Sequence, residues 1–539
     1  MEDSRRPSPS IRHSSQSPRA PALSAIEIWD RVVVAAAIGV LGWLFWENAY
    51  LASRLIDRTR YFVLDDDMMV SMRYARNLVE GNGLVWNVGE RVEGYTNFLW
   101  TLVMAGLHLT GVADAKMALL VKGTGFVLMA ATLQLAVWIL RVFAPRSFAA
   151  SVLLLTSMVM CVDVIHWSVW GFETSLLTFL QMVFLWRVVR GSQDWLCFGA
   201  LALIPITRSD ASYLFLADAG IALVLAKEPR RTLLWLGLAL APFVVHLGFR
   251  RSFYGEWLPN TYFLKVYQID ALHRRGATYA RGFLLHYSIV LTLAAGAALA
   301  IARTDRRGLV FFAVVLSTLG YVVFTGGDMF DNFRFFAHVM PIVFIFAAAG
   351  VARVAHDRIG ALVWAAVLVL CSVPVIRPFD RLIALDRNGD PYEQLQVAML
   401  MKKNALPTSS VAVIAAGIVP YFTRMPAIDV LGKSDRHIAR LTPFPGSMVG
   451  HGKGDPTYTL DRRPDFVVSL RAHDYVMSLA RDTRTTDAVL RFLASHAFQD
   501  RYRNHVIDEQ FTRGRTAVYT YPGSPEYDRR QWQSVSVGP

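Results

Sequence analysis

Charged residues and cysteines are scarce in this sequence of 539 residues. Only 18% of the residues are charged, whereas 54% are hydrophobic, and the mean hydropathy is +0.35. This balance excludes an ordinary soluble protein and indicates a polytopic membrane protein. The three cysteines, Cys161, Cys197 and Cys371, all lie inside apolar runs. We therefore expect neither a disulfide framework nor a CxxC metal site.

Signals for nucleotide and nucleic-acid binding are also missing. The net charge of +13 accompanies many apolar runs, so we interpret it as membrane sidedness and predict no nucleic-acid partner. The segment GHGKGD at 450–455 lacks the GxxxxGK[ST] spacing of a phosphate-binding loop. We also find no internal symmetry of the kind that many transporters show.

Apolar runs account for most of the first 375 residues. The predicted spans are 31–50, 115–140, 147–165, 172–189, 194–209, 211–226, 232–249, 284–302, 308–325, 335–353 and 359–375. The run 98–109 is too short for the roughly 20 residues of a spanning helix, so we place it at the outer interface. The basic clusters that follow the spans then all lie on the side of the N-terminal tail, as the positive-inside rule requires.

Composition divides the chain into three predicted parts. Residues 1–24 are rich in Ser, Pro and Arg and are expected to form a disordered cytoplasmic tail. Residues 25–375 form a transmembrane domain of about eleven helices, with an external loop at 51–114. Residues 376–539 are expected to form a soluble α/β domain outside the membrane, with strands at 411–416, 466–470 and 516–521 and helices at 392–404 and 475–495.

The segment 61–100, YFVLDDDMMVSMRYARNLVEGNGLVWNVGERVEGYTNFLW, is the main candidate for a site. Its acids Asp65, Asp66 and Asp67 open a helical pattern that ends at a Gly-Asn-Gly stop signal. Carboxylates at a helix start face the positive end of the helix dipole, which favours their ionised form. A solvated helix cap is the alternative to a functional role.

Other polar groups are predicted at the same external surface. The candidates for binding a lipid phosphate are Arg73, Arg208, Lys265 and Arg334. The candidates for binding sugar or acceptor are Glu93, Tyr95, Asn97, Glu173, Asn260, Asp328, His451 and Lys453. Structural alternatives remain open: turn chemistry for EGYTN, a helix cap for Glu173 and an internal salt-bridge network for Asp435, Arg436 and His437.

The order of motifs resembles a known family. The chain carries DDMMVSMRYARNLVEGNGLVWN, RVEGYTNFLW, WGFET, YGEWLPNTYFLK, GGD with a following RF, DVLGKSDRHIA, GHGKGD and RPDFVV, in this order from residue 65 to 469. This pattern resembles the mycobacterial-type terminal arabinofuranosyltransferases, which are GT-C glycosyltransferases. The resemblance implies a lipid-phosphate donor such as decaprenylphosphoryl-arabinose and transfer to an acceptor at the outer face of the cytoplasmic membrane. It also places the family's aspartate pair at Asp66 and Asp67.

The reaction needs a base or a stabilising carboxylate, a cation for the leaving phosphate and an apolar groove for the polyprenyl tail. We expect Asp66 to be the base and Asp67 to be its orienting partner or a metal ligand, which leaves a divalent cation open. The acceptor is a glycan, a lipid or a protein. Transfer of mannose or another pentose from polyprenyl phosphate, and a non-enzymatic lipid-sugar transporter, are the alternatives.

Overall fold

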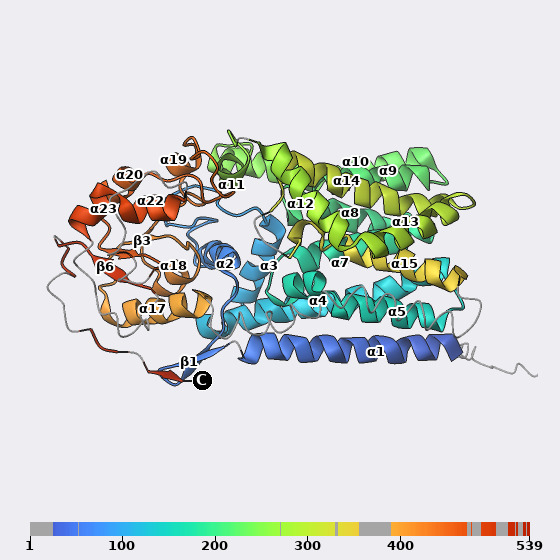
Figure 1. The fold of residues 1–539 in the computed structure, drawn as a ribbon, viewed down its shortest axis with the longest axis horizontal. Helices are drawn as coiled ribbons and strands as arrows, with labels where there is room; N and C mark the ends of the chain where they lie inside the picture. The colour runs from blue at the N-terminus through green and yellow to red at the C-terminus, as the bar shows by residue number, and fades with distance from the viewer. Residues whose placement is uncertain are drawn as a thin grey trace, which may run out of the picture.

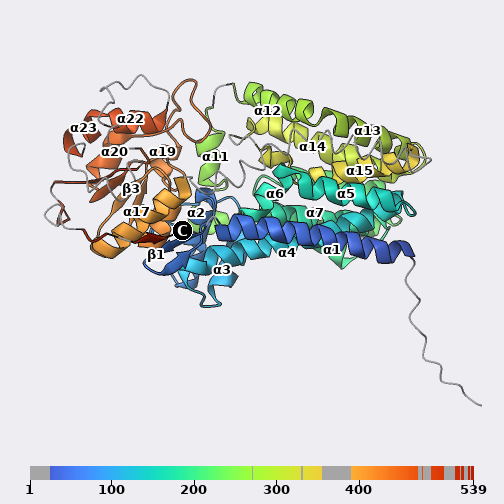
Figure 2. The same ribbon diagram turned by 60° about the horizontal axis from the view of Figure 1, so that its bottom comes forward.

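The computed structural model describes residues 25–51, 53–269, 271–328, 332–354, 390–471, 476, 487–502, 516–522, 524–526, 532–534 and 536–538. Two halves lie side by side along the long axis of the molecule (Figure 1). One half is a bundle of helices, and the other half contains a sheet with helices on both faces. In both ribbon views the short helix α11 (Asn260–Lys265) lies where the two halves meet (Figure 2).

The helical half follows the apolar runs of the sequence. Its helices are α1 (Ala25–Trp46), η1 (Glu47–Leu51), α4 (Asp114–Phe143), α5 (Phe148–Met160), α6 (Val162–Val169), α7 (Thr174–Val189), α8 (Trp195–Thr207), α9 (Ser212–Val224), α10 (Pro229–Tyr254), α12 (Leu272–His286), α13 (Ser288–Ala302), η2 (Arg306–Gly308), α14 (Leu309–Thr325), η3 (Arg334–Phe336) and α15 (Met340–Val354). Four of the described helical segments are long and apolar enough to cross a membrane: Ile26–Tyr50, Asp114–Phe143, Pro229–Tyr254 and Arg306–Thr325.

Two further crossings are bent. The pair α5 and α6 bends by 59°, and the pair α12 and α13 bends by 82°, which gives up to six spans among the described residues. Four other predicted spans form the shorter helices α7, α8, α9 and α15. Three of these begin or end at polar residues of the cavity described below, which explains why they stop short. The predicted span 359–375 and the tail 1–24 lie outside the described residues.

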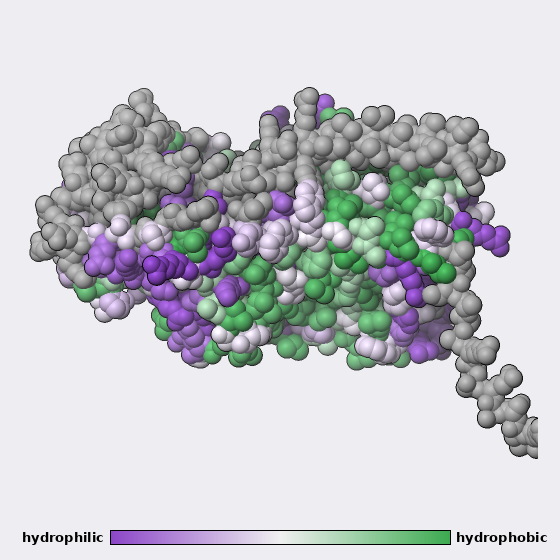
Figure 3. Space-filling model, turned by 90° about the horizontal axis from the view of Figure 1, so that it is seen from below, coloured by the Kyte–Doolittle hydropathy of each residue, from purple (hydrophilic) through white to green (hydrophobic). Residues whose placement is uncertain are grey.

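The outer surface of the helical half is apolar. Leu234 on α10 is 73% exposed, Val245 on the same helix is 71% exposed, and Trp43 on α1 is 52% exposed. Figure 3 shows a broad hydrophobic face over the helical half and hydrophilic side chains toward both ends of the molecule. Exposed apolar area on this scale marks a surface that contacts lipid. The chain is therefore a multi-pass membrane protein.

The loop after the first span has its own structure. It contains β1 (Arg54–Ile56), β2 (Thr59–Tyr61), α2 (Asp66–Val79) and α3 (Phe98–His108). β1 and β2 form an antiparallel hairpin, and β7 (Val537–Gly538) pairs antiparallel with β1. The apolar helix α3 has 11 residues, too few to cross a bilayer, and packs against α2.

The other half is built around a four-stranded sheet with the order β4-β3-β5-β6. The strands β4 (Ala427–Asp429), β3 (Val411–Val413) and β5 (Phe466–Val468) are parallel, and β6 (Val518–Thr520) is antiparallel to β5. The helices here are α17 (Asp390–Asn404), α18 (Ile418–Thr423), α19 (Arg436–Ala439), α20 (Pro456–Asp461), α22 (Ala488–Ala494) and α23 (His496–Arg501). The predicted strands at β3, β5 and β6 and the predicted helix at α17 are confirmed.

Side chains along each strand alternate between the two faces of the sheet, so each strand contributes to two hydrophobic cores. Val411 and Val413 on β3 belong to the large core that continues into the membrane half, whereas Ala412 belongs to a separate core shared with α20, α22 and α23. β5 follows the same rule, because Phe466 joins the first core and Val467 joins the second. Successive side chains of a strand point to opposite faces, so one short sheet holds both layers.

Candidate functional site

A cavity of about 430 Å³ lies between the two halves of the molecule. Its charged and amide-bearing wall residues are Asp67, Asn97, Glu173, Arg208, Asp210, Lys265, Asp328, Arg334 and Lys433. They come from the start of α2, from the ends of α7, α8 and α11, and from the segments that precede η3 and α19. Groups that are far apart in the sequence therefore meet in one hollow.

The start of α2 turns two neighbouring carboxylates in different directions. Asp65 is the N-cap, and its side chain accepts a hydrogen bond from the amide of Asp67. Asp67 lines the cavity. The carboxylate of Asp66 instead accepts hydrogen bonds of 3.0 Å from the amides of Gly417 and Ile418 at the start of α18. Successive helical residues point about 100° apart, which separates the two directions.

This placement revises the prediction for Asp66. Asp66 is absent from the cavity wall and holds the sheet-containing half against α2. Gly417 accepts this close approach because it has no side chain, since a Cβ there would lie 2.1 Å from the backbone oxygen of Asp66. Asp67 is the member of the pair that can meet a substrate.

The surroundings of the three aspartates shift their pKa values in different directions. Burial and the negative charges of Asp67 and Asp66 raise the pKa of Asp65 to about 7. Burial raises the pKa of Asp66 to about 6, against the hydrogen bond from Ile418. Burial would raise the pKa of Asp67 too, but the positive charges of Lys433, Lys265 and Arg334 outweigh it and hold that pKa below its ordinary value. Asp67 is therefore ionised at neutral pH.

Cations surround Asp67 inside the cavity. Lys433 Nζ lies 2.6 Å from one carboxylate oxygen of Asp67, and Arg334 Nη1 lies 4.0 Å from the other. Arg334 also lies 2.7 Å from Asp328, which is 5% exposed. Lys265 lines the same wall, and burial lowers its pKa. A phosphate entering here would meet several positive charges beside the carboxylates of Asp67 and Asp328.

A second arginine, Arg208, lines the same hollow. Arg208 donates to both carboxylate oxygens of Asp210, and its Nε lies 3.7 Å from Glu173. Asp210 also accepts a hydrogen bond from the Tyr321 hydroxyl. Asn97 donates to Glu173 at 3.3 Å, which links this group to the loop before α3. Glu173 stands at the N-cap position of α7 without a capping hydrogen bond, so its carboxylate serves this network instead.

Apolar side chains form another part of the wall. They are Met68, Leu258, Val266, Phe324 and Val449, together with the rings of Tyr95, Tyr213 and Phe335. The Tyr95 hydroxyl lies 3.1 Å from that of Tyr254, and the Ser71 hydroxyl donates to Asn97 at 2.9 Å. The cavity thus joins a charged patch to an apolar surface. Among the described residues, no group of three or more His, Cys, Asp or Glu side chains is placed to hold a metal ion.

Two predicted residues of the external loop have structural contacts instead. Arg73 is buried and donates to the backbone oxygens of Trp86 and Met425, at 2.6 and 2.8 Å. Glu93 is 3% exposed and pairs with Arg250 at 2.6 Å. Both side chains are therefore engaged within the fold and neither lines the cavity, so the roles of Arg73 in binding phosphate and of Glu93 in binding sugar stay predictions.

Three more predicted residues lie outside the cavity wall. Asn260 donates to the backbone oxygens of Gly432, Lys433 and Asp435. Lys453 donates to those of Phe263, Ala439 and Tyr267, and burial lowers its pKa to about 8. The His451 ring lies 3.2 Å from the oxygen of Val449. These side chains act on the backbone of this junction, so their predicted role in binding sugar or acceptor is revised.

The sequence analysis missed Lys433, Asp210, Ser71 and Tyr321 as cavity residues. Lys433 belongs to the motif DVLGKSDRHIA, whose charged side chains were interpreted as a structural network. That interpretation suits Arg436, which donates to the backbone oxygens of Arg91 and Tyr254. The position of Lys433 inside a motif shared with the resembled family was the available signal.

Comparisons with known proteins agree with this geometry. The sequence is 25% identical over 312 residues to a terminal beta-(1->2)-arabinofuranosyltransferase of Mycobacterium tuberculosis, covering 54% of this chain and 47% of the relative. A protein of the same name from Corynebacterium glutamicum is 24% identical over 332 residues, covering 53% of this chain and 48% of the relative. The chain spans about half the length of these curated relatives. A domain of unknown function (DUF8728) matches residues 385–528.

Solved structures share the fold. The apo structure of ArnT from Cupriavidus metallidurans has a TM-score of 0.55 and 14% identity, covering 92% of this chain and 98% of that chain. The oligosaccharyltransferase AglB from Archaeoglobus fulgidus, solved with an inhibitory peptide and a dolichol-phosphate, has a TM-score of 0.51 and 10% identity, covering 84% of this chain and 71% of that chain. The chain thus has the GT-C fold and is similar in sequence to the terminal arabinofuranosyltransferases.

Proposed function

We propose that the protein is a membrane glycosyltransferase that moves a sugar from a polyprenyl-phosphate donor to an acceptor outside the cytoplasmic membrane. One observation carries this proposal: Asp67 lies beside Lys433, Arg334 and Lys265 in a cavity whose wall also includes apolar side chains. A carboxylate can take a proton, the cations can hold a phosphate, and the apolar wall suits a lipid tail.

The proposed reaction uses each of these groups. The acceptor hydroxyl oxygen attacks the anomeric carbon, and the bond from that carbon to the phosphate oxygen breaks. The hydroxyl proton goes to Asp67, and the bonding electrons leave with the polyprenyl phosphate. Arg334, Lys265 and Lys433 stabilise the charge on the departing phosphate. Because the incoming phosphate shares the cations that keep the pKa of Asp67 low, donor binding makes this carboxylate a stronger base.

The donor class follows from the fold and the wall of the cavity. AglB, which shares the fold, was solved with a dolichol-phosphate. The apolar side chains of Met68, Val266, Phe324 and Val449 give a prenyl chain a matching surface next to the cations. The sequence relatives support arabinofuranose as the sugar. Another pentose or mannose is the alternative, because the wall residues bind phosphate and hydroxyl groups without selecting one ring.

The membrane arrangement belongs to the same proposal. We place about eleven spans in the inner membrane, with the N-terminus in the cytoplasm and the cavity and residues 376–539 on the outer side. The proposed division of the chain also includes a cytoplasmic tail at 1–24 and a transmembrane domain at 25–375. Cysteine accessibility tests this arrangement: a cysteine in place of Arg462 should react with a membrane-impermeant maleimide in intact cells, and one in place of Arg146 should not.

The donor assay tests the reaction itself. Purified protein in liposomes is given a panel of polyprenyl-phosphate sugars that includes decaprenylphosphoryl-arabinose, with an oligosaccharide acceptor. We expect wild type to release free polyprenyl phosphate and to elongate the acceptor, and Asp67→Asn to do neither. Transfer without loss in Asp67→Asn would remove this residue from the reaction. Absence of transfer by wild type from every donor would reject the proposed function.

A further inference from the structure

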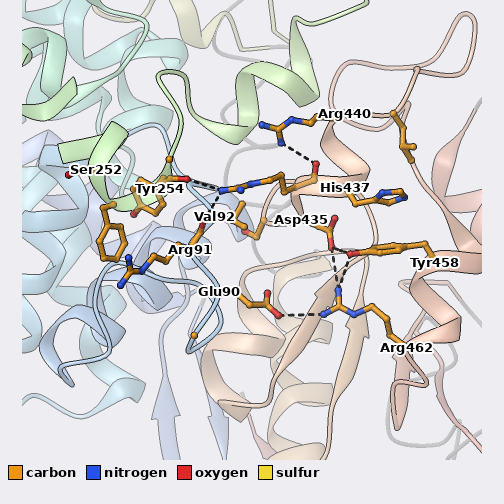
Figure 4. Close-up of a pocket in the computed structure, with 16 residues that line it drawn as sticks. Glu90, Arg91, Val92, Ser252, Tyr254, Asp435, His437, Arg440, Tyr458 and Arg462 are labelled. Atoms are coloured by element: carbon orange, nitrogen blue, oxygen red, sulfur yellow. Dashed lines mark hydrogen bonds and ion pairs between the residues drawn. The ribbon is translucent and has the colours of Figure 1, made fainter. Parts of the chain in front are cut away.

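A second hollow lies on the other side of the segment that carries Lys433. This cleft of about 970 Å³ is lined by the loop 89–92, by the end of α10 and by residues of α19 and α20 (Figure 4). Lys433 faces the catalytic cavity, whereas the next three residues, from Ser434 to Arg436, line the cleft. The turn after α10 is shared too, since Tyr254 lines the cleft and Leu258 lines the cavity.

Most of the arginines that line the cleft are engaged by carboxylates or by backbone oxygens. Arg462 lies 3.4 Å from both Glu90 and Asp435, and Figure 4 shows it between these two acids. Arg440 pairs with Glu256 at 2.6 Å. A deep positive well would attract a free anion, but here carboxylates or backbone oxygens engage most of the guanidinium groups. The cleft therefore presents paired donors and acceptors instead of a bare positive charge.

An aromatic surface borders these polar groups. The rings of Tyr458 and His437 lie 4.2 Å apart, and the Tyr458 hydroxyl lies 3.1 Å from Asp435. Tyr458 is half-buried, whereas His437 and Arg462 are exposed. A flat ring beside fixed donors and acceptors suits a ring-shaped, neutral molecule that carries many hydroxyl groups. An oligosaccharide has this chemistry.

We infer that this cleft binds the distal sugars of the acceptor glycan while the acceptor's terminal sugar lies in the catalytic cavity. The inference rests on the proposed function, because it extends the acceptor from the reacting end outward. Two shared walls support it: the segment that ends in Arg436 and the turn from Tyr254 to Leu258. Trp257 lies on that turn and is 60% exposed, so the turn offers a glycan an accessible indole ring.

Acceptors of two lengths distinguish binding of distal sugars in the cleft from a purely structural role of its residues. We would measure transfer to an arabinofuranose disaccharide and to an octasaccharide with wild type, Arg462→Ala and Tyr458→Phe. Arg462→Ala should raise KM for the octasaccharide about ten-fold, which corresponds to about 1.4 kcal/mol, and leave kcat and the disaccharide KM unchanged. Tyr458→Phe keeps the ring and loses one hydroxyl, so its effect should be smaller.

Arg501→Ala is the matched control, because Arg501 pairs with Asp461 at 2.7 Å on the surface and lies outside the cleft. Equal changes for both acceptors, or no change for either, would overturn the inference. Weaker binding to anionic vesicles without a change in KM would reassign the cleft to lipid.

A direct measurement of oligosaccharide binding tests the cleft independently of the proposed sugar transfer. Full-length protein in nanodiscs, without donor, should bind the octasaccharide, and Arg462→Ala should bind it about ten-fold more weakly at an unchanged melting temperature. This result would support the cleft even if wild type transferred no sugar from the donors offered. A wild type that transfers sugar but has the same affinity for both oligosaccharides would reject the cleft and leave the proposed function standing.

Discussion

Asp66 and Asp67 are neighbours in the sequence but face two different regions of the molecule. Asp66 faces the backbone amides of Gly417 and Ile418, whereas Asp67 faces the side chains of Lys433 and Arg334. Backbone amides cannot move away without unfolding α18, so the first region is a fixed joint. Side-chain cations can be shared with an incoming phosphate, so the second region can exchange partners. The difference shows that the surroundings, more than the residue type, assign each carboxylate its role.

Replacing each of the two carboxylates in turn should give the largest effect on kcat. Asp67→Asn should lower kcat by about 10²- to 10⁴-fold, because the proton acceptor is lost, and should change the melting temperature little. Asp66→Asn should lower the melting temperature and leave more activity per folded molecule. Transfer assays and thermal unfolding of both variants check this. A larger loss of kcat in Asp66→Asn than in Asp67→Asn would reverse the assignment.

Arginines offer a second test of the contrast between cavity and joint. Arg334→Lys should lower kcat/KM for the donor about 10- to 100-fold, because a lysine keeps the charge but loses the forked geometry that holds phosphate. Arg73→Lys is the control, since Arg73 donates to backbone oxygens away from the cavity. It should lower the melting temperature and leave the donor KM unchanged. Equal donor KM values for Arg334→Lys and wild type would place the phosphate elsewhere.

The joint itself can be strained without touching the cavity wall. Gly417→Ala forces a methyl group against the backbone of Asp66 and should destabilise the protein by about 1–3 kcal/mol. Gly106→Ala on α3 has open space around the new methyl group and should leave stability unchanged or raise it by up to about 1 kcal/mol. Tryptophan fluorescence melts compare the two. A Gly417→Ala protein as stable as wild type would show that the approach at α18 is loose.

The acid limb of the pH profile tests the cation that faces Asp67. Lys433→Met removes a positive charge that lowers the pKa of Asp67, so that pKa should rise. Because only the ionised carboxylate accepts a proton, activity should then fall at a higher pH than in wild type as the medium is acidified. Lys433→Arg keeps the charge and should retain the wild-type acid limb. The pH profile of kcat/KM for the three proteins measures this, and identical limbs would exclude the coupling.

The general position of the site was predictable, but the assignment of single residues was less so. Apolar runs indicated the membrane class, and the acids at the start of α2, together with the motif order, led to residues that line the cavity. The cavity wall includes the predicted residues Arg208, Lys265 and Arg334. Each lies at the end or the start of a helix, which places it near the mouth of the cavity. Which aspartate faces the cavity depends on the rotation of α2 against α18, and no local pattern encodes that rotation.

Several predicted site residues bind the backbone and lie outside the cavity wall. Arg73, Asn260 and Lys453 have the side chains expected of a binding site, yet each satisfies carbonyl groups of a junction between distant segments. A buried carbonyl needs a donor as much as a ligand does. The sequence shows which side chains can donate a hydrogen bond. It does not show which backbone carbonyl needs a donor, because every residue has one. Cavity residues also shorten the helices that carry them, so the described residues hold four to six spans by length and composition.

The contact between Asp67 and Lys433 joins positions 366 residues apart. During synthesis, every helix up to α15 leaves the ribosome before Lys433 does, and the sheet must then fold and dock before the lysine reaches the carboxylate. A nascent chain already embedded in lipid therefore lacks one of the charges that prepare the cavity.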